Sequence, residues 1–150
     1  MNISFDLDDT LIIHNSLKHR NEKLLNGEYL RNGTIQLLKK LSKHHKIFIY
    51  TTSFRNPILV KLLFKLKGIN IEKVINQSIH IEQMHKMKLE NFPSKLPTAF
   101  GINLHIDDSQ GVLYEGENFN FKTLIIDNDN ENWDDEILKY VSTCVAGLKN

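Results

Sequence analysis

Three carboxylates and a hydroxyl group stand close together near the start of the sequence. Asp6, Asp8 and Asp9 directly follow an apolar, β-prone run, and Thr10 comes next. Adjacent carboxylates repel one another and are costly to desolvate, so a strand gains no stability from such an ending. A site that holds a divalent cation and attacks a phosphoryl group needs such a cluster. We therefore treat Asp6 and Asp8 as candidate catalytic residues.

Two further polar clusters follow apolar runs later in the chain. Thr51 and Thr52 end one run, and Asp107 and Asp108 end another. The acidic candidates offer only oxygen ligands, without a thiolate or a well-spaced histidine pair, which favours Mg²⁺ over zinc. Phosphoryl transfer needs an in-line nucleophile, a proton for the leaving oxygen and positive charge near the other phosphoryl oxygens. One aspartate can attack, a second can carry the proton, and Thr51 with a lysine can hold the oxygens.

The elements that must position these clusters alternate along the chain. Apolar runs predict five strands, at 3–7, 47–50, 74–75, 102–106 and 122–126. Apolar periodicity and helix-terminal residues predict helices at 33–44, about 57–67, 80–89 and 133–148. This alternation predicts an α/β fold: a doubly wound, three-layer, mostly parallel five-stranded sheet. Ligands bind such sheets at the carboxyl ends of the strands, so the three clusters should meet at one edge.

The bulk composition is that of one globular domain, and we expect a single domain over residues 1–150. The formal net charge of +1 gives no case for a membrane partner, nor for nucleic acid beyond a phosphorylated end. Cys144 is the single cysteine, which excludes an internal disulfide and fits a reducing compartment. We find no signal peptide and no apolar stretch near the roughly 20 residues of a membrane span. These observations predict a cytoplasmic protein and do not indicate its oligomeric state.

The three clusters resemble motifs of the haloacid dehalogenase (HAD) superfamily. The run Asp6-Leu7-Asp8-Asp9-Thr10 after an apolar strand is similar to its first motif, DxDxT. Residues 47–51 resemble the second motif, an apolar strand that ends in Thr or Ser. Residues 102–108 resemble the fourth motif, an apolar strand that ends in paired aspartates. The motifs occur in the family's order over residues 3–126, and the resemblance implies a Rossmann-like core of the HAD type.

The resemblance also implies an activity, that of a Mg²⁺-dependent phosphatase that hydrolyses a phosphomonoester. Asp6 would be the nucleophile and form an aspartyl-phosphate, while Asp8 would protonate the leaving group and then activate water. Thr51, with Thr52 beside it, would bind phosphoryl oxygens. Four residues would hold the metal: the Asp6 carboxylate, the Asp8 backbone carbonyl, Asp107, and Asp108 either directly or through water.

The third motif of the family is a lysine that neutralises the phosphoryl group, and it has little sequence context. Lys86, Lys88 and Lys95 all lie in the allowed region. We favour Lys95 because Pro93 and Pro97 flank it and constrain the loop just before the fourth strand.

The gaps between the motifs leave no room for the substantial cap domain that many family members insert. A capless site is open, as in members that act on phosphorylated macromolecules or on accessible small phosphates. Three alternatives stay open: a HAD-type phosphotransferase, a non-enzymatic receiver-like phospho-acceptor domain, and a degenerate HAD-like binding module. The phosphorylated substrate itself cannot be read, because specificity lies in loops, here 11–32 and 76–100.

Several other residues allow two interpretations. Arg55 could contact a second anionic group of the substrate, or lead a helix in solvent. His105 lies inside a strand, where we expect a hydrogen-bonded core residue rather than a ligand. The pair at 107–108 could instead cap a helix after Ser109. Residues 127–131 are similar to a calcium loop but lack its Gly and Glu, so we expect Asn132 to cap an acidic helix start instead.

The polar segment after Thr10 is expected to form a small hairpin with its turn at Asn26-Gly27. If it overhangs the site it would attract anions, and an ordinary solvated loop is the alternative. Its basic residues are His14, Lys18, His19, Arg20, Lys23 and Arg31.

Overall fold

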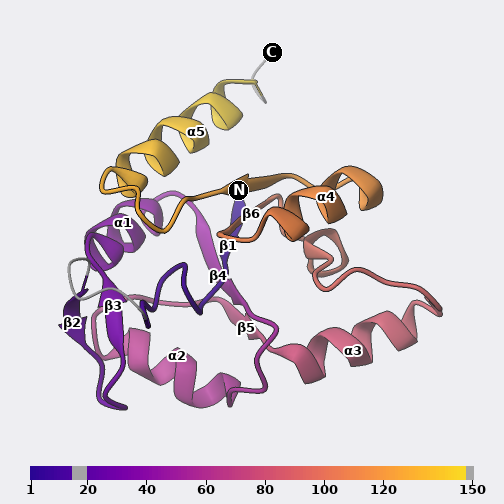
Figure 1. Cartoon of the computed structure of the whole chain (residues 1–150), viewed down its shortest axis with the longest axis horizontal. Coiled ribbons are helices and arrows are strands. Elements are labelled where there is room, and N and C mark those ends of the chain that lie inside the picture. The colour runs from indigo at the N-terminus through magenta and orange to yellow at the C-terminus, as the bar shows by residue number, and fades with distance from the viewer. Residues whose placement is uncertain (15–19, 148–150) are drawn as a thin grey trace.

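The computed structural model describes residues 1–14 and 20–147 and shows helices on both faces of a central sheet (Figure 1). Its strands are β1 (Asn2–Phe5), β2 (Arg20–Lys23), β3 (Tyr29–Arg31), β4 (Lys46–Tyr50), β5 (Lys73–Ile75), β6 (Leu104–Asp107) and β7 (Thr123–Ile125). Its helices are α1 (Thr34–Leu41), α2 (Pro57–Lys65), α3 (Gln77–Lys86), the 3₁₀ helix η1 (Pro97–Phe100), α4 (Gln110–Phe119) and α5 (Trp133–Gly147).

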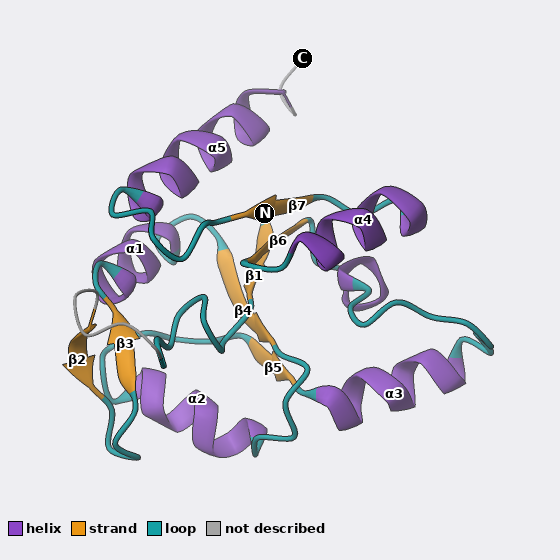
Figure 2. Ribbon diagram, viewed as in Figure 1, coloured by secondary structure: helices purple, strands orange, loops and turns teal. Residues whose placement is uncertain are grey.

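Five of the strands form one sheet in the order β5-β4-β1-β6-β7, and every neighbouring pair is parallel (Figure 2). The chain leaves β1 on one side to build β4 and β5, then crosses over to build β6 and β7 on the other side. The strand order therefore reverses beside β1, and such a reversal is where open α/β sheets bind ligands. The predicted five-stranded, doubly wound fold is confirmed.

Alternate residues of the strands face the two helical layers. Ile47 and Ile49 of β4 pack in the core beneath α1, α2 and α5, whereas Phe48 and Tyr50 belong to the core of the opposite face. Figure 1 shows α1, α2 and α5 on one side of the sheet, with α3 and α4 on the other. Both faces of the sheet are covered, which explains why its strands are apolar at nearly every position.

Two helices begin directly after an asparagine whose side chain caps the helix N-terminus. Asn56 caps α2 by accepting from the backbone N–H groups of Ile58 and Leu59 at 2.9 and 3.3 Å, and Pro57 follows it as predicted. Asn76 caps α3 in the same way, so that helix begins three residues before the predicted start at residue 80. The sequence prediction missed this cap because it placed Asn76 at the end of a weak strand.

The segment after β1 forms the expected small hairpin. Strands β2 and β3 pair antiparallel, and Gly27 in the connecting turn has a φ of 91°, a left-handed conformation that suits glycine. Lys18 and His19 lie outside the described residues. Arg31 does not overhang the expected site, because its side chain is buried. Its Nη2 donates to three backbone carbonyls of the β7–α5 loop, those of Asp127, Asn128 and Asn130.

The remaining described elements belong to the core fold, and none of them forms a cap domain. Helix α4 follows Ser109, and α5 carries three acidic residues in its first turn, as expected for residues 134–136. None of the described helices is long and apolar enough to cross a membrane. Within residues 1–14 and 20–147, the hairpin is the largest addition to the two helical layers and the sheet.

Candidate active site

The carboxyl ends of three adjacent strands meet at one pocket of about 370 Å³. Asp6 follows β1, Thr51 follows β4, and Asp107 is the last residue of β6. Every residue that the sequence analysis proposed for catalysis, phosphate binding or metal binding lines this pocket, together with Ser94, Ser109 and Val112. The predicted residues are Asp6, Asp8, Thr51, Thr52, Lys95, Asp107 and Asp108.

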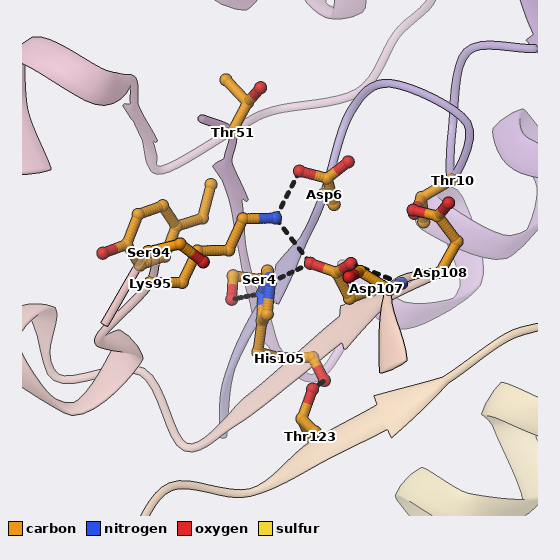
Figure 3. Close-up of polar contacts among 12 residues, drawn as sticks. Ser4, Asp6, Thr10, Thr51, Ser94, Lys95, His105, Asp107, Asp108 and Thr123 are labelled. Atoms are coloured by element: carbon orange, nitrogen blue, oxygen red, sulfur yellow. Dashed lines mark hydrogen bonds and ion pairs between the residues drawn. The ribbon is translucent and has the colours of Figure 1, made fainter. Parts of the chain in front are cut away.

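Lys95 bridges two of the carboxylates (Figure 3). Its Nζ lies 2.5 Å from Oδ1 of Asp6 and 2.5 Å from Oδ2 of Asp107, and all three side chains are buried. The other two candidate lysines lie elsewhere. Lys86 pairs with Glu82 on the exposed side of α3, and Lys88 is an exposed residue with a left-handed φ of 57° just after that helix. Of the three, Lys95 alone lies in the pocket.

Negative charge exceeds positive charge around Lys95. Burial, together with the nearby charges of Asp107 and Asp108, raises the pKa of Asp6 to about 7, although Lys95 opposes that shift. Burial and the charge of Asp107 also raise the pKa of Asp108. Burial opposes ionisation of Lys95, but the two carboxylates that it contacts raise its pKa above the ordinary value, so it remains an ammonium ion.

His105 orients Asp107 from within the sheet. Its Nε2 lies 2.9 Å from Oδ2 of Asp107, and its Nδ1 lies 2.7 Å from the hydroxyl of Ser4. Burial lowers the pKa of His105 to about 4, so the ring is neutral and carries one N–H group. That hydrogen belongs on Nε2, since a carboxylate can only accept, and Ser4 donates to Nδ1. The expected core role of His105 is confirmed, and its contact with Asp107 was not foreseen.

Asp107 and Asp108 accept further hydrogen bonds near the pocket. The backbone N–H of Ser109 donates to Oδ1 of Asp107 at 2.8 Å, and the hydroxyl of Thr10 donates to Oδ1 of Asp108 at 3.1 Å. Burial opposes ionisation of Asp107, but hydrogen bonds from His105 and Lys95 hold its pKa below the ordinary range. Thr10, the last residue of the first motif, thus connects the β1 loop to the acidic pair.

Asp9 shapes the loop that carries Asp8. It has a left-handed φ of 60°, which aspartate tolerates better than most residues, and its N–H donates to the carbonyl of Ile12 at 2.7 Å. The N–H groups of Leu11 and Ile12 both donate to the carbonyl of Leu7 and close the turn. The carboxylate without an assigned role in the sequence is therefore a turn residue.

Asp8 contacts two basic side chains. Its Oδ1 accepts from Nη2 of Arg55 at 2.6 Å and lies 2.9 Å from Nε2 of His14. Arg55 also pairs with both carboxylate oxygens of Glu28 on the hairpin, at 2.7 and 2.8 Å. Burial opposes ionisation of Asp8, but the contacts with Arg55 and His14 lower its pKa. Arg55 is half-buried rather than exposed in solvent and ties Asp8 to the hairpin, while its contact with an anionic group of the substrate stays a prediction.

Thr51 lies at the end of β4 with its hydroxyl in a local turn. Oγ1 of Thr51 donates to the hydroxyl of Ser53 at 3.1 Å and accepts from the backbone N–H of Ser53 at 3.1 Å. The side chain is buried at the pocket wall, while Thr52 beside it is exposed. Both residues line the pocket.

The pocket fits a hard divalent cation by the chemistry of its donors. The side chains of Asp6, Asp8, Asp107 and Asp108 provide only oxygen ligands. Burial, followed by the negative charges of Asp107 and Asp108, raises the pKa of Asp6 although Lys95 opposes the shift. Among the described residues, the three side chains whose ligand atoms lie within 4.8 Å of one another are Asp8, His14 and Glu28. The Arg55 guanidinium already pairs with two of these three residues, Asp8 and Glu28. The acidic residues around Asp6 are therefore the better match for a divalent cation.

Comparisons with known proteins identify the family of the chain. The chain matches the model of the NLI interacting factor-like phosphatase family over residues 2–91. This range includes Asp6, Asp8 and Thr51 and ends before Lys95 and Asp107, which the three-dimensional structure brings to the same pocket. A comparison with curated protein sequences finds no match.

The fold is similar to that of a solved protein. The structure of a predicted HAD-like family hydrolase from Porphyromonas gingivalis aligns with a TM-score of 0.53 at 17% sequence identity. The alignment covers 93% of this chain and 97% of that one. The capless HAD-type fold that the motifs predicted is confirmed.

Proposed function

The chain belongs to the NLI interacting factor-like phosphatase family and is a phosphatase, and we propose that it hydrolyses a phosphomonoester through a covalent intermediate on Asp6. The observation that carries the proposal is the position of the Asp6 carboxylate. It follows the central strand, lies between Thr51 and Asp107 on the neighbouring strands, and has one oxygen held by Lys95. A nucleophile needs to be held in this way to attack in line.

The proposed reaction has two steps that use Asp6 and Asp8 in turn. A carboxylate oxygen of Asp6 attacks phosphorus, the bond from phosphorus to the leaving oxygen breaks, and protonated Asp8 gives that oxygen its proton. Water then attacks the aspartyl-phosphate, the bond from phosphorus to Asp6 breaks, and Asp8 takes the proton from water. The products are the alcohol and inorganic phosphate, and both aspartates return to their starting states.

Asp8 must carry a proton for the first step, although Arg55 and His14 favour its charged form in the free protein. A bound phosphate brings negative charge into the pocket, and a nearby like charge raises the pKa of a carboxyl group. We therefore infer that substrate binding itself prepares Asp8 as the acid. Release of the phosphate restores the charged form of Asp8.

Positive charge for the phosphoryl oxygens comes from two sources in this proposal. Lys95 supplies a fixed ammonium group. Thr51 and Thr52 line the same pocket and would donate hydrogen bonds to the phosphoryl oxygens. Mg²⁺, held by Asp6, Asp107, Asp108 and the backbone carbonyl of Asp8, would supply charge that stabilises the transition state. The ion pair with Lys95 holds the Asp6 carboxylate in place before substrate binds.

Phosphate release from an aryl phosphate tests the proposal. Purified protein with Mg²⁺ should release phosphate, and exhaustive chelation should abolish the activity. Asp6→Asn should lower kcat by about 10³-fold or more, since removing a nucleophile has effects of this size. Asp9→Asn is the matched control, because Asp9 is a turn residue and asparagine also tolerates its left-handed φ.

The covalent step has its own test. Asp8→Asn should slow the second step and allow the phosphorylated enzyme to accumulate, which intact-protein mass spectrometry detects as one added phosphoryl group. The same adduct should be absent from Asp6→Asn. Activity that survives Asp6→Asn or chelation would contradict the mechanism.

A further inference from the structure

The segment that presents Lys95 is tied down on both sides by two buried side chains from other elements. The Nε2 atom of His80 on α3 lies 3.0 Å from the backbone carbonyl of Pro93. The backbone N–H of Leu96 donates to the hydroxyl oxygen of Tyr50, the last residue of β4, at 2.9 Å. The same hydroxyl lies 2.5 Å from Nδ1 of His80, so the two side chains join the ends of the segment.

The positions of the hydrogens in this arrangement follow from the partners. The Pro93 carbonyl can only accept, so Nε2 of His80 carries the hydrogen and donates it. Nδ1 of the neutral ring then accepts from the hydroxyl of Tyr50, whose oxygen accepts from Leu96. Each group donates or accepts as its chemistry requires, and the chain of bonds begins and ends on the segment that holds Lys95. We call it the Tyr50–His80 relay.

The relay is rigid because it is buried. Tyr50 and His80 are both fully buried, and the ring of Tyr50 meets the ring of Phe100 edge-on with centroids 5.4 Å apart. The ring of Phe92 packs against that of His80 in the same way at 5.5 Å. If the segment moved and broke one of these hydrogen bonds, a buried polar group would lose its partner, which costs free energy. The burial therefore restricts the segment to one position.

A third tie acts on the outer side of the same segment. The backbone N–H and the hydroxyl of Ser94 both donate to the carboxylate of Glu115 on α4, at 2.8 and 2.7 Å. This contact is exposed to solvent, so it restrains the loop less than the buried relay does. Lys95, which follows Ser94 in the pocket lining, is the residue of 93–96 whose side chain contacts Asp6 and Asp107.

We propose that Tyr50 and His80 are positioning residues that hold Lys95 Nζ between Asp6 and Asp107, in the position from which it neutralises the phosphoryl group. Tyr50 directly precedes Thr51, so one strand end supports two groups that face the phosphoryl oxygens. The inference rests on the proposed function, in which Lys95 neutralises charge in the transition state. It adds two residues that never touch the substrate and act through the lysine.

Tyr50→Phe is the first variant to test, because it removes the hydroxyl and keeps the ring. Displacement of a catalytic group by about 1 Å can lower a rate about 100-fold, so we expect kcat to fall by about 10- to 100-fold. KM should change little, since the lost interaction belongs to the transition state. Tyr140→Phe on α5 is the matched control, because it makes the same chemical change on a helix whose described residues do not line the pocket, and it should leave kcat unchanged.

A double-mutant cycle with Lys95→Met separates positioning from a general structural effect. If Tyr50 acts through Lys95, Tyr50→Phe should not lower kcat further in the Lys95→Met background. The affinity for inorganic phosphate in the presence of Mg²⁺, measured by calorimetry, should stay near the wild-type value in Tyr50→Phe, as KM should. A general loss of structure would instead reduce kcat and phosphate affinity by the same factor in both backgrounds.

His80 provides a variant series that does not alter the tyrosine. His80→Gln keeps one donor and one acceptor and should retain more activity than His80→Leu, which keeps neither. Wild-type kcat in Tyr50→Phe, equal activity of the two His80 variants, or additive effects in the cycle would each overturn the positioning role. If Asp6→Asn stays active, the proposed function fails instead, so the two failures are distinguishable.

Discussion

The Lys95 ammonium group lies between two buried carboxylates, and each of the three charges depends on the others. Asp6 and Asp107 come from strands that flank each other, and without Lys95 their negative charges would face one another in a buried setting. Removing one member of a buried ion pair is far more costly than removing both, because the remaining charge is left without a partner. The nucleophile is thus held by a contact that also supports the fold.

We expect Lys95→Met to lower the free energy of unfolding by about 3–5 kcal/mol in the absence of divalent cations. Added Mg²⁺ should restore part of this loss, since a cation held by Asp6 and Asp107 replaces the missing charge. Urea denaturation in EDTA and in Mg²⁺ measures both effects.

Lys86→Met is the control for this measurement. Lys86 forms an exposed pair with Glu82 four residues earlier on α3, so its loss should cost less than about 0.5 kcal/mol in either buffer. A Lys95→Met variant as stable as the wild type in EDTA would contradict the account of the buried charges.

At the scale of elements, Arg55 connects the side chains of the hairpin after β1 to Asp8 in the pocket. Arg55 comes from the loop between β4 and α2, Glu28 from the hairpin and Asp8 from the loop after β1. The paired forks of arginine and carboxylate fix both distance and direction. The hairpin therefore affects the orientation of Asp8, although none of its described residues lines the pocket.

Arg55→Met should affect catalysis more than stability. Its side chain is 27% exposed, so the loss of its ion pairs should cost only about 1 kcal/mol, whereas Asp8 loses the contact that orients it. We expect kcat to fall by about 10-fold or more, as is typical when an acid–base group is misplaced. Steady-state kinetics and urea denaturation of the same preparation give the two values.

Lys67→Met is the matched control for Arg55→Met. Lys67 pairs with Glu22 at 2.8 Å and its side chain is 29% exposed. The substitution therefore removes a comparable ion pair that does not involve Asp8. Equal kcat values for the two variants would show that Arg55 has no special relation to the catalytic acid.

For the whole molecule, the same sheet supports both stability and the site. Its two faces carry separate apolar cores, and both include residues from β4, the strand that ends at Thr51. Polar groups are also buried in this interior, among them His80 and His105. Because burial disfavours the charged form of a histidine, the folded state takes up protons on these rings less readily than the unfolded chain does.

The pH dependence of unfolding follows from this difference. Burial lowers the pKa of His80 in the folded state below its ordinary value of 6.5, so on acidification the unfolded chain gains the proton first. The contribution of His80 to stability is thus complete above pH 6.5 and is lost as the pH falls below it. His80→Gln lacks this group, so the stability difference between wild type and variant should narrow on acidification. Urea denaturation at several pH values between 5 and 8 measures it, and a constant difference would contradict the prediction.

The parts of the site that sequence could predict are those that end strands. Asp6, Thr51 and Asp107 each follow an apolar run, and parallel strands must bring such residues to one edge. Lys95 was favoured only by its flanking prolines, since a loop lysine has no local pattern of its own.

The supporting residues could not be predicted, because their partners are distant in sequence. Tyr50 contacts Leu96 across 46 positions, and Arg55 contacts Asp8 across 47. Nothing in the neighbourhood of either residue indicates these contacts. Arg31 looked like a surface charge and is buried, because its guanidinium satisfies three backbone carbonyls and stacks on the ring of Trp133 at 4.6 Å.

The central place of β1 has a consequence for the order of events during synthesis. This strand is made before the other strands of its sheet, yet it pairs with both β4 and β6, and β6 ends at Asp107. At about 5–20 residues per second, a ribosome needs roughly 5–20 s to add the hundred residues between the two strands. Throughout that interval one edge of β1 stays open to wrong partners. A nascent chain that stops before β6 holds its nucleophile but lacks both Asp107 and the strand that would bring it there.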